Sequence, residues 1–230
     1  NYTASVDNIL SKINKKTKLI FLANPNNPTG TFISKNEVIR LHESIPKNIL
    51  FVYDAAYSEF VTNDNYIDGS ELAEKYENVI MLRTFSKLHG LASLRLGWGY
   101  ASETIIENLM KVRGPFSVNA AAIMAGVAAL EDLEFQKKSV KHNLKWMSWF
   151  EKELKLLNLD FQSSITNFLL IKFPVEQKYS ADNAESYLAS KGILVRGMKV
   201  YGLSNYLRVS IGNKEENIKF INELKTFFMK

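Results

Sequence analysis

Short apolar runs recur along the first hundred residues of the chain, and polar residues follow each of them. These runs lie at residues 18–23, 49–54, 79–84 and 97–101. Runs of this length are typical of buried strands, and helical patterns at residues 35–44 and 69–75 separate the first three. This alternation predicts βαβ units and therefore an α/β protein with a mostly parallel sheet and helices packed beside it.

After residue 116 the alternating units give way to a mixed segment. Helical patterns are expected at residues 103–112, just before this change, and at residues 118–130, 131–157, 181–191 and 214–229. Strand patterns are expected at residues 167–173, 193–196 and 206–211. A Gly-Pro pair at positions 114 and 115 interrupts the apolar pattern just before this change. We therefore predict a large domain over residues 1–116 and a smaller α+β C-terminal domain over residues 117–230.

The loop after the first predicted strand has the sequence NPNNPTG, from Asn24 to Gly30. Proline fixes its own φ and disfavours a helical conformation in the residue before it, so Asn24 and Asn27 are expected to be extended. Gly30 can adopt the positive φ that closes a turn. Ser34 and Glu37 then fit a capping box. The loop is therefore pre-shaped, either as a plain connection to a helix or as a binding loop.

Composition and charge exclude several classes of function. The chain has no cysteine, no apolar run of about 18 residues and no basic-then-apolar leader, which predicts a soluble, cytoplasmic protein with no membrane partner. The net charge of +5 comes largely from lysines opposite an apolar stripe at residues 131–157, with no nucleic-acid reader motif. The three histidines lack metal-ligand spacing, so we expect neither a nucleic-acid partner nor a metal site.

Side chains with useful chemistry follow three of the predicted strands. Asn27 follows the first, Asp54 ends the second and Lys87 follows the third. In open parallel sheets, ligands bind beyond the carboxyl ends of the strands. A lysine can bond covalently to an aldehyde, and a buried carboxylate can keep a ring nitrogen protonated. Both together are what pyridoxal phosphate requires.

Further side chains near these positions suit the remaining groups of that cofactor. Tyr57 and Asn27 could donate hydrogen bonds to its phenolate oxygen, and Thr84, Ser86 and Arg95 could bind its phosphate. Each residue alone has an ordinary alternative as a helix cap, a core residue, a surface charge or an ion-pair partner. Their combination, in this order along the chain, favours the cofactor site.

Four ordered motifs carry a family resemblance. They are NPNNPTG at residues 24–30, DAAY at 54–57, TFSK at 84–87 and GLASLRLG at 90–97. The set resembles the fold-type I pyridoxal-phosphate aminotransferases, and most of all the histidinol-phosphate aminotransferases and their close relatives. PFSVN, TNFLLIKF, KGILVRGM and LRVSIG, at residues 115–119, 166–173, 191–198 and 207–212, extend the resemblance along the whole chain.

The resemblance implies roles for the cofactor site. Lys87 would be the Schiff-base lysine, Asp54 would pair with the ring nitrogen, and Asn27 and Tyr57 would bind the phenolate oxygen. The cofactor phosphate would be held by Thr84, Ser86 and Arg95.

The resemblance also implies a substrate site and partners. Arg208 would bind the carboxylate or phosphate of the substrate, Arg196 would be a second arginine for its anionic tail, and Asn167 would help to position that end. The implied reaction is transamination of histidinol phosphate with 2-oxoglutarate and glutamate, in histidine biosynthesis, by a homodimer.

The sequence departs from the family pattern in three respects. Ala55 stands where Glu is common, and Ser93 where Gly is common. The chain also begins at Asn1, whereas family members carry a long preceding stretch with a glycine-rich phosphate turn and a stacking aromatic. We therefore expect the C-terminal two-thirds of such an enzyme, with a pyridoxal-phosphate-binding large domain that is incomplete at its N-terminus. An aromatic aminotransferase, a phosphothreonine decarboxylase and an inactive remnant stay open as alternatives.

Overall fold

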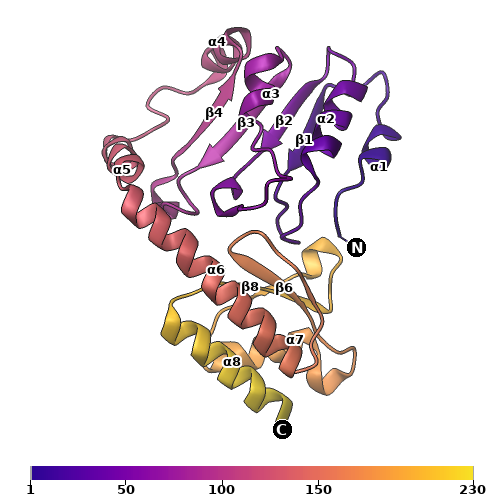
Figure 1. The fold of residues 1–230 in the computed structure, drawn as a ribbon, viewed down its shortest axis with the longest axis vertical. Helices are drawn as coiled ribbons and strands as arrows, with labels where there is room; N and C mark the ends of the chain where they lie inside the picture. The colour runs from indigo at the N-terminus through magenta and orange to yellow at the C-terminus, as the bar shows by residue number, and fades with distance from the viewer. Residues whose placement is uncertain (1, 230) are drawn as a thin grey trace. The chain divides into compact units, whose positions relative to one another are not determined.

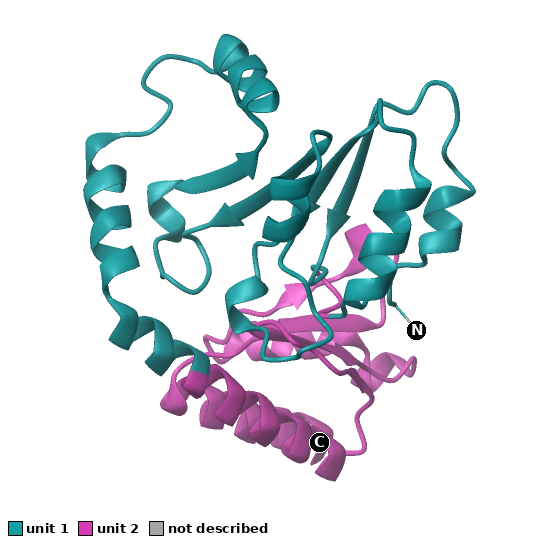
Figure 2. Cartoon of the chain, turned by 45° about the horizontal axis from the view of Figure 1, so that its top comes forward, with its two compact units in different colours: residues 1–27, 31–140 teal, residues 28–30, 141–230 magenta. Residues whose placement is uncertain are grey.

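The computed structural model describes residues 2–229. Contacts divide the chain into two compact units (Figure 2). The first unit contains the residues up to Asn27 together with Thr31–Val140, and the second contains Pro28–Gly30 together with the residues from Lys141 onward. The predicted domain division after residue 116 stays a prediction.

The first unit is built on a four-stranded sheet with the order β1-β2-β3-β4 (Figure 1). Its strands are β1 (Leu19–Ala23), β2 (Leu50–Asp54), β3 (Val79–Thr84) and β4 (Gly97–Ala101). Its α-helices are α1 (Val6–Leu10), α2 (Lys35–Ser44), α3 (Ser70–Lys75), α4 (Glu103–Val112) and α5 (Ala120–Glu131), and two 3₁₀ turns are η1 (Ser58–Phe60) and η2 (Ala92–Leu94). The first three strands are parallel and β4 is antiparallel to β3. The first three strands therefore end at the same edge of the sheet.

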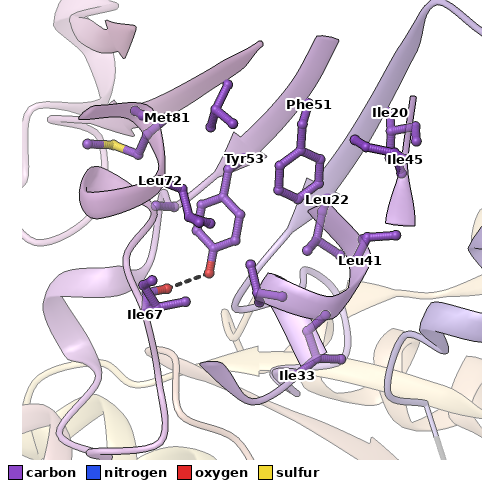
Figure 3. Packing of buried hydrophobic residues seen from close by; sticks show 14 of the residues in the cluster. Ile20, Leu22, Ile33, Leu41, Ile45, Phe51, Tyr53, Ile67, Leu72 and Met81 are labelled. Carbon is purple, nitrogen blue, oxygen red and sulfur yellow. Dashed lines mark hydrogen bonds between the residues drawn. The ribbon is translucent and has the colours of Figure 1, made fainter. Parts of the chain in front are cut away.

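One face of this sheet forms a hydrophobic core with the helices that follow its strands (Figure 3). In β1 the residues alternate, so that Ile20 and Leu22 are buried and Phe21 is exposed. Phe51 and Tyr53, at the centre of β2, have no exposed surface. Burial of one such large apolar side chain contributes about 1.5–3 kcal/mol. The core therefore holds rigidly the strand ends from which the candidate site loops leave.

The second unit contains an antiparallel sheet with the order β5-β6-β8-β7. Its strands are β5 (Phe161–Gln162), β6 (Phe168–Lys172), β7 (Arg196–Gly197) and β8 (Tyr206–Ser210). Its helices are α7 (Ala181–Ser190), α8 (Lys214–Met229) and most of α6 (Leu133–Leu156), with 3₁₀ turns η3 (Gln177–Tyr179) and η4 (Lys199–Tyr201). Buried residues of all three helices pack with Leu169, Ile171, Leu207 and Val209 from one face of the sheet.

Most predicted elements are confirmed with small differences at their ends. The helices at 35–44, 103–112 and 214–229 have the predicted bounds. The strand predicted at residues 193–196 is wrong, because pairing begins only at Arg196. The main-chain N–H of Ile193 instead donates to the carbonyl of Leu188 at 2.9 Å, which closes the end of α7. The patterns did not predict α1 or β5, which are short.

The capping box at α2 is only half formed. The hydroxyl of Ser34 accepts from the main-chain N–H of Glu37 at 3.3 Å, as predicted. The Glu37 carboxylate does not complete the box, because it accepts two hydrogen bonds from Arg40 at 2.7 and 2.8 Å. Within residues 2–229, none of the helices combines the length and apolar character needed to cross a lipid bilayer.

Candidate active site

The NPNNPTG loop is held by its first asparagine. The Asn24 side chain is 1% exposed, and its Oδ1 accepts from the main-chain N–H of Ile33 at 2.9 Å. Its Nδ2 donates to the carbonyl of Ile33 at 3.2 Å and to the hydroxyl of Tyr53 at 2.8 Å. The side chain therefore binds both main-chain groups of Ile33, as a neighbouring strand would, and closes the loop at its base.

Two tyrosine hydroxyls form hydrogen bonds at this asparagine. The Tyr53 hydroxyl donates to the carbonyl of Ile67 at 2.5 Å (Figure 3), and the Tyr66 hydroxyl donates to the carbonyl of Asn24 at 2.8 Å. Burial is the main cause that raises the pKa of both phenols above the usual value. Both hydroxyls therefore stay protonated and can donate over the whole physiological pH range.

The turn at the end of the same loop uses Gly30. Its φ is +74°, which confirms the predicted left-handed conformation. A Cβ at this position would lie 2.6 Å from the Cβ of Ser164, so the close approach also requires glycine. Asn27, between these two fixed ends, is exposed. The loop therefore presents the Asn27 side chain from a constrained backbone.

Asp54 is the last residue of β2 and is half-buried. Its Oδ1 accepts from the main-chain N–H of Ala56 at 3.0 Å, which forms a tight Asx-type turn. Its main-chain carbonyl accepts from Asn24 at 3.0 Å and so continues the pairing with β1. The turn directs the chain to Tyr57, which is 5% exposed. The carboxylate is thus fixed at the carboxyl edge of the sheet.

Lys87 lies in the turn after β3 and contacts the loop after β2. Its Nζ is 5.2 Å from the centre of the Tyr57 ring. This separation is within the range of a cation–π interaction. The structure therefore brings together an amine and a phenol that follow different strands, as the edge of a parallel sheet predicts.

The three predicted phosphate ligands flank Lys87 along the chain. Thr84 ends β3, and its Oγ1 accepts from the main-chain N–H of Ser86 at 3.1 Å. Arg95 is exposed, has a φ of +55° and donates from Nη1 to the carbonyl of Ala92 at 2.7 Å. A positive φ is uncommon for a residue other than glycine and costs on the order of 1 kcal/mol. The guanidinium thus leaves a constrained turn between η2 and β4.

The predicted substrate residues belong to the second unit. Arg196 in β7 is directly opposite Arg208 in β8, so both side chains leave the same face of the sheet. Both arginines line a cavity of about 650 Å³. The Arg208 guanidinium also lies 4.9 Å from the centre of the Phe168 ring. The carbonyl of Asn167 accepts from Ile211 at 2.9 Å, beside the same strand end.

Two like charges opposite each other in paired strands are unfavourable. Arg196 is exposed, whereas Arg208 is half-buried. A guanidinium binds phosphate or carboxylate through two parallel hydrogen bonds, and an anion between two such groups would relieve their repulsion. The pair therefore has the arrangement expected of an anion site.

Sequence patterns did not identify the residues that hold the loops. Asn24 was expected only to be extended, and no pattern marked its bonds to Ile33 and Tyr53. The available signal was a polar residue directly after a buried run. The partners of such a residue depend on which strand lies next to it, and that is a tertiary property.

With this geometry in view, comparison with known proteins identifies the family. Residues 1–224 match the model of the aminotransferase class I and II family. The chain belongs to this family. Its α/β class, with parallel strands and flanking helices, is the class predicted from the sequence.

Several members of the family are similar over nearly the whole chain. The chain is 48% identical to a histidinol-phosphate aminotransferase of Maricaulis maris over 99% of its own length and 63% of that protein. It is 45% identical to a histidinol-phosphate aminotransferase of Paramagnetospirillum magneticum, over 98% of its own length and 62% of that protein. The histidinol-phosphate aminotransferase of Sinorhizobium meliloti, solved with pyridoxal-5'-phosphate, matches with 25% identity and a TM-score of 0.89, covering 98% of this chain and 61% of that structure. The chain thus spans somewhat less than two-thirds of the length of these relatives.

Proposed function

We propose that this chain is the part of a pyridoxal-phosphate-dependent histidinol-phosphate aminotransferase that holds the cofactor-bonding lysine and the substrate arginines. The observation that carries the proposal is the placement of Asp54, Tyr57 and Lys87 at the carboxyl ends of adjacent strands, with Lys87 Nζ 5.2 Å from the Tyr57 ring. Identities of 48% and 45% to histidinol-phosphate aminotransferases support it.

The side chains available in the first unit suit each functional group of pyridoxal phosphate. Lys87 supplies the amine for the aldehyde, and Asp54 supplies a carboxylate for the ring nitrogen. The phenolate oxygen would receive hydrogen bonds from Tyr57 and Asn27. For the phosphate, the hydroxyls and the guanidinium come from Thr84, Ser86 and Arg95.

When bound, the cofactor supplies an electron sink for the carbanion that forms at the substrate's amino-bearing carbon. The residues of this chain would perform the remaining tasks. Lys87 Nζ would act as the base that takes the proton from that carbon of the substrate and as the acid that returns it. Asp54 would hold the ring nitrogen protonated, and the Tyr57 hydroxyl would hold the phenolate oxygen in place.

The arginines of the second unit would select an anionic substrate. Histidinol phosphate has a phosphate but no α-carboxylate, whereas glutamate has two carboxylates. Arg208 would bind the phosphate in one half-reaction and a carboxylate in the other, and Arg196 would reinforce the phosphate. Asn167, which directly precedes β6, would position the same end of the substrate.

The wider biology is part of the same proposal. We infer an enzyme of histidine biosynthesis that uses the glutamate and 2-oxoglutarate pair and acts as a cytoplasmic homodimer. Sedimentation of the purified protein would test the oligomeric state, since a monomer under assay conditions contradicts it.

Single-turnover kinetics with histidinol phosphate, phenylalanine and glutamate would test the substrate assignment. We expect histidinol phosphate and glutamate to react efficiently and phenylalanine to react poorly. Equal efficiency on phenylalanine and histidinol phosphate, unchanged by removal of Arg196, would favour an aromatic aminotransferase. If the protein mixed with pyridoxal phosphate shows no absorbance band near the violet edge of the visible spectrum, the chain would be an inactive remnant of an aminotransferase.

A further inference from the structure

Arg83 is the charged residue of strand β3, and four apolar residues precede it in that strand. Its side chain is only 13% exposed. Nη1 donates to Glu59 Oε1 at 2.9 Å, and Nη2 donates to Asp68 Oδ2 at 2.6 Å. The guanidinium therefore binds two carboxylates that come from the long connection between β2 and β3. Because its planar donors have a fixed geometry, the guanidinium also sets how far apart these carboxylates lie.

The surroundings of this ion-pair cluster hold it in one arrangement. Trp98 is opposite Arg83 in the β3 and β4 pairing, and its ring centre is 5.9 Å from the guanidinium carbon. Asp68 Oδ1 also accepts from the main-chain N–H and the hydroxyl of Ser70, at 3.0 and 2.6 Å. Burial opposes ionisation of Asp68, but the Ser70 hydrogen bonds and the Arg83 charge outweigh it and lower the pKa of Asp68. Asp68 is thus ionised at neutral pH.

The cluster joins the loop that carries Tyr57 to the strand that leads to Lys87. Arg83 directly precedes Thr84, in the strand that leads to Lys87. Glu59 lies in η1, two residues after Tyr57. The ion pair of Arg83 with Glu59 therefore lies close along the chain to the contact between Lys87 and Tyr57, and it connects the loop after β2 to the strand that leads to Lys87.

We propose that Arg83 is a positioning residue, which sets the distance between Lys87 Nζ and the Tyr57 ring by binding Glu59 and Asp68. The proposal rests on the proposed role of Lys87 for its functional meaning, but its geometric content concerns this chain alone. A flexible loop after β2 could place Tyr57 in many positions, and two charge-assisted hydrogen bonds restrict it to one. The alternative is an ion pair that stabilises the fold and leaves the lysine environment unchanged.

Reductive ¹³C-methylation of the lysines, read by NMR without cofactor, separates these alternatives. The Lys87 signal, assigned with Lys87→Arg, should be displaced upfield by the Tyr57 ring, and Tyr57→Leu should remove that displacement. Arg83→Met and the milder Glu59→Gln should each remove at least half of it. Arg83→Lys, which keeps the charge but not the planar fork, should give an intermediate value.

Arg40→Met is the matched control. Arg40 also binds two carboxylates, those of Glu37 and Asp7, each at 2.7 Å, but it lies on α2. This change should leave the Lys87 signal in place. If Arg83→Met and Glu59→Gln lower the melting temperature yet leave the Lys87 signal where it is in the unaltered protein, Arg83 is only structural and the proposal is wrong.

In the cofactor-loaded enzyme, Arg83→Met should lower kcat about tenfold with little change in KM, because the substrate arginines are unaffected. A rise in KM with unchanged kcat would contradict the positioning role. An altered Lys87 signal in an enzyme that proves inactive on every substrate would leave the positioning role intact while removing the proposed function. The two proposals can therefore fail separately.

Discussion

In the first unit the candidate site residues lie on loops after three parallel strands, whereas in the second unit Arg196 and Arg208 lie within paired antiparallel strands. The loops bring chemically different groups to one edge of the sheet, but their backbones need additional restraint. Asn24 and Arg83 supply it through buried hydrogen bonds and ion pairs.

The strands of the second unit need no such restraint. Strand pairing itself holds the backbones of Arg196 and Arg208 opposite each other. The arrangement suits one repeated chemical task, the binding of an anion, and it places two like charges together. In the proposed enzyme, loops would thus form a chemically varied site that needs additional restraint, while a sheet face would form a uniform anion site in which like charges repel each other.

The largest expected effect comes from removing the amine of the first unit. Lys87→Ala should lower transamination by about 10⁴-fold or more, because the chain loses both the bond to the cofactor and the group that moves the proton. The Lys87→Arg variant should lose transamination as well. Borohydride reduction with pyridoxal phosphate, followed by peptide mass spectrometry, checks the assignment. Label on another lysine would refute it, and Lys111→Ala, on exposed α4, is the control.

Asp54→Asn changes the same site of the first unit and should cause a smaller but still large loss of turnover. We expect turnover to fall by about 10²- to 10⁴-fold while some cofactor is retained, because a neutral amide no longer keeps the ring nitrogen protonated. The Asn oxygen can still accept from Ala56, so the turn should survive. Steady-state kinetics should show the loss in kcat more than in KM. Near-native turnover would contradict the role, and Asp64→Asn, an exposed residue, is the control.

The paired arginines of the second unit should respond differently from each other. Loss of a hydrogen-bonded charged contact costs about 1.5–3 kcal/mol, or about 10- to 100-fold. Arg208→Ala should therefore weaken both half-reactions by this factor. Arg196→Ala should mainly raise KM for the phosphorylated substrate. Single-turnover kinetics of each half-reaction would measure both effects.

The stability of the Arg196→Ala variant should change in the opposite sense to its affinity for substrate. Removing Arg196 takes away one of two like charges at paired strand positions and should leave the free energy of unfolding unchanged or raise it by less than about 1 kcal/mol. Urea unfolding at low and high salt would measure this change. A clear loss of stability on Arg196→Ala would mean that the residue has a structural role.

A further prediction tests how Asn24 and Tyr53 hold the first loop. Tyr53→Phe removes the hydroxyl that binds Asn24 and Ile67, which leaves a buried carbonyl without that donor. We expect a loss of about 1–2 kcal/mol in the free energy of unfolding, measured by urea titration. Tyr100→Phe, at a residue of edge strand β4 that is 43% exposed, should change it by less than about 0.5 kcal/mol. Equal effects would show that the buried network adds no stability.

The arrangement of the candidate site could be predicted from the sequence in the first unit but not in the second. Asp54 and Lys87 could be assigned to one edge because apolar runs of strand length mark their own ends and parallel strands align. The opposition of Arg196 and Arg208 could not be predicted. The apolar run before Arg196 resembles a strand, but Ile193 closes helix α7 and only two residues pair.

By itself, the sequence determined the alternation of strands and helices, the order of the site motifs and the family to which the chain belongs. These are local properties, because hydrophobic period, proline, glycine and caps act within a few residues. Only the tertiary structure decided that Asn24 binds Tyr53, that Arg83 joins Glu59 to Asp68, and that two arginines share one face of a sheet. Such contacts join residues far apart along the chain, and which of them form depends on how strands and helices pack in three dimensions.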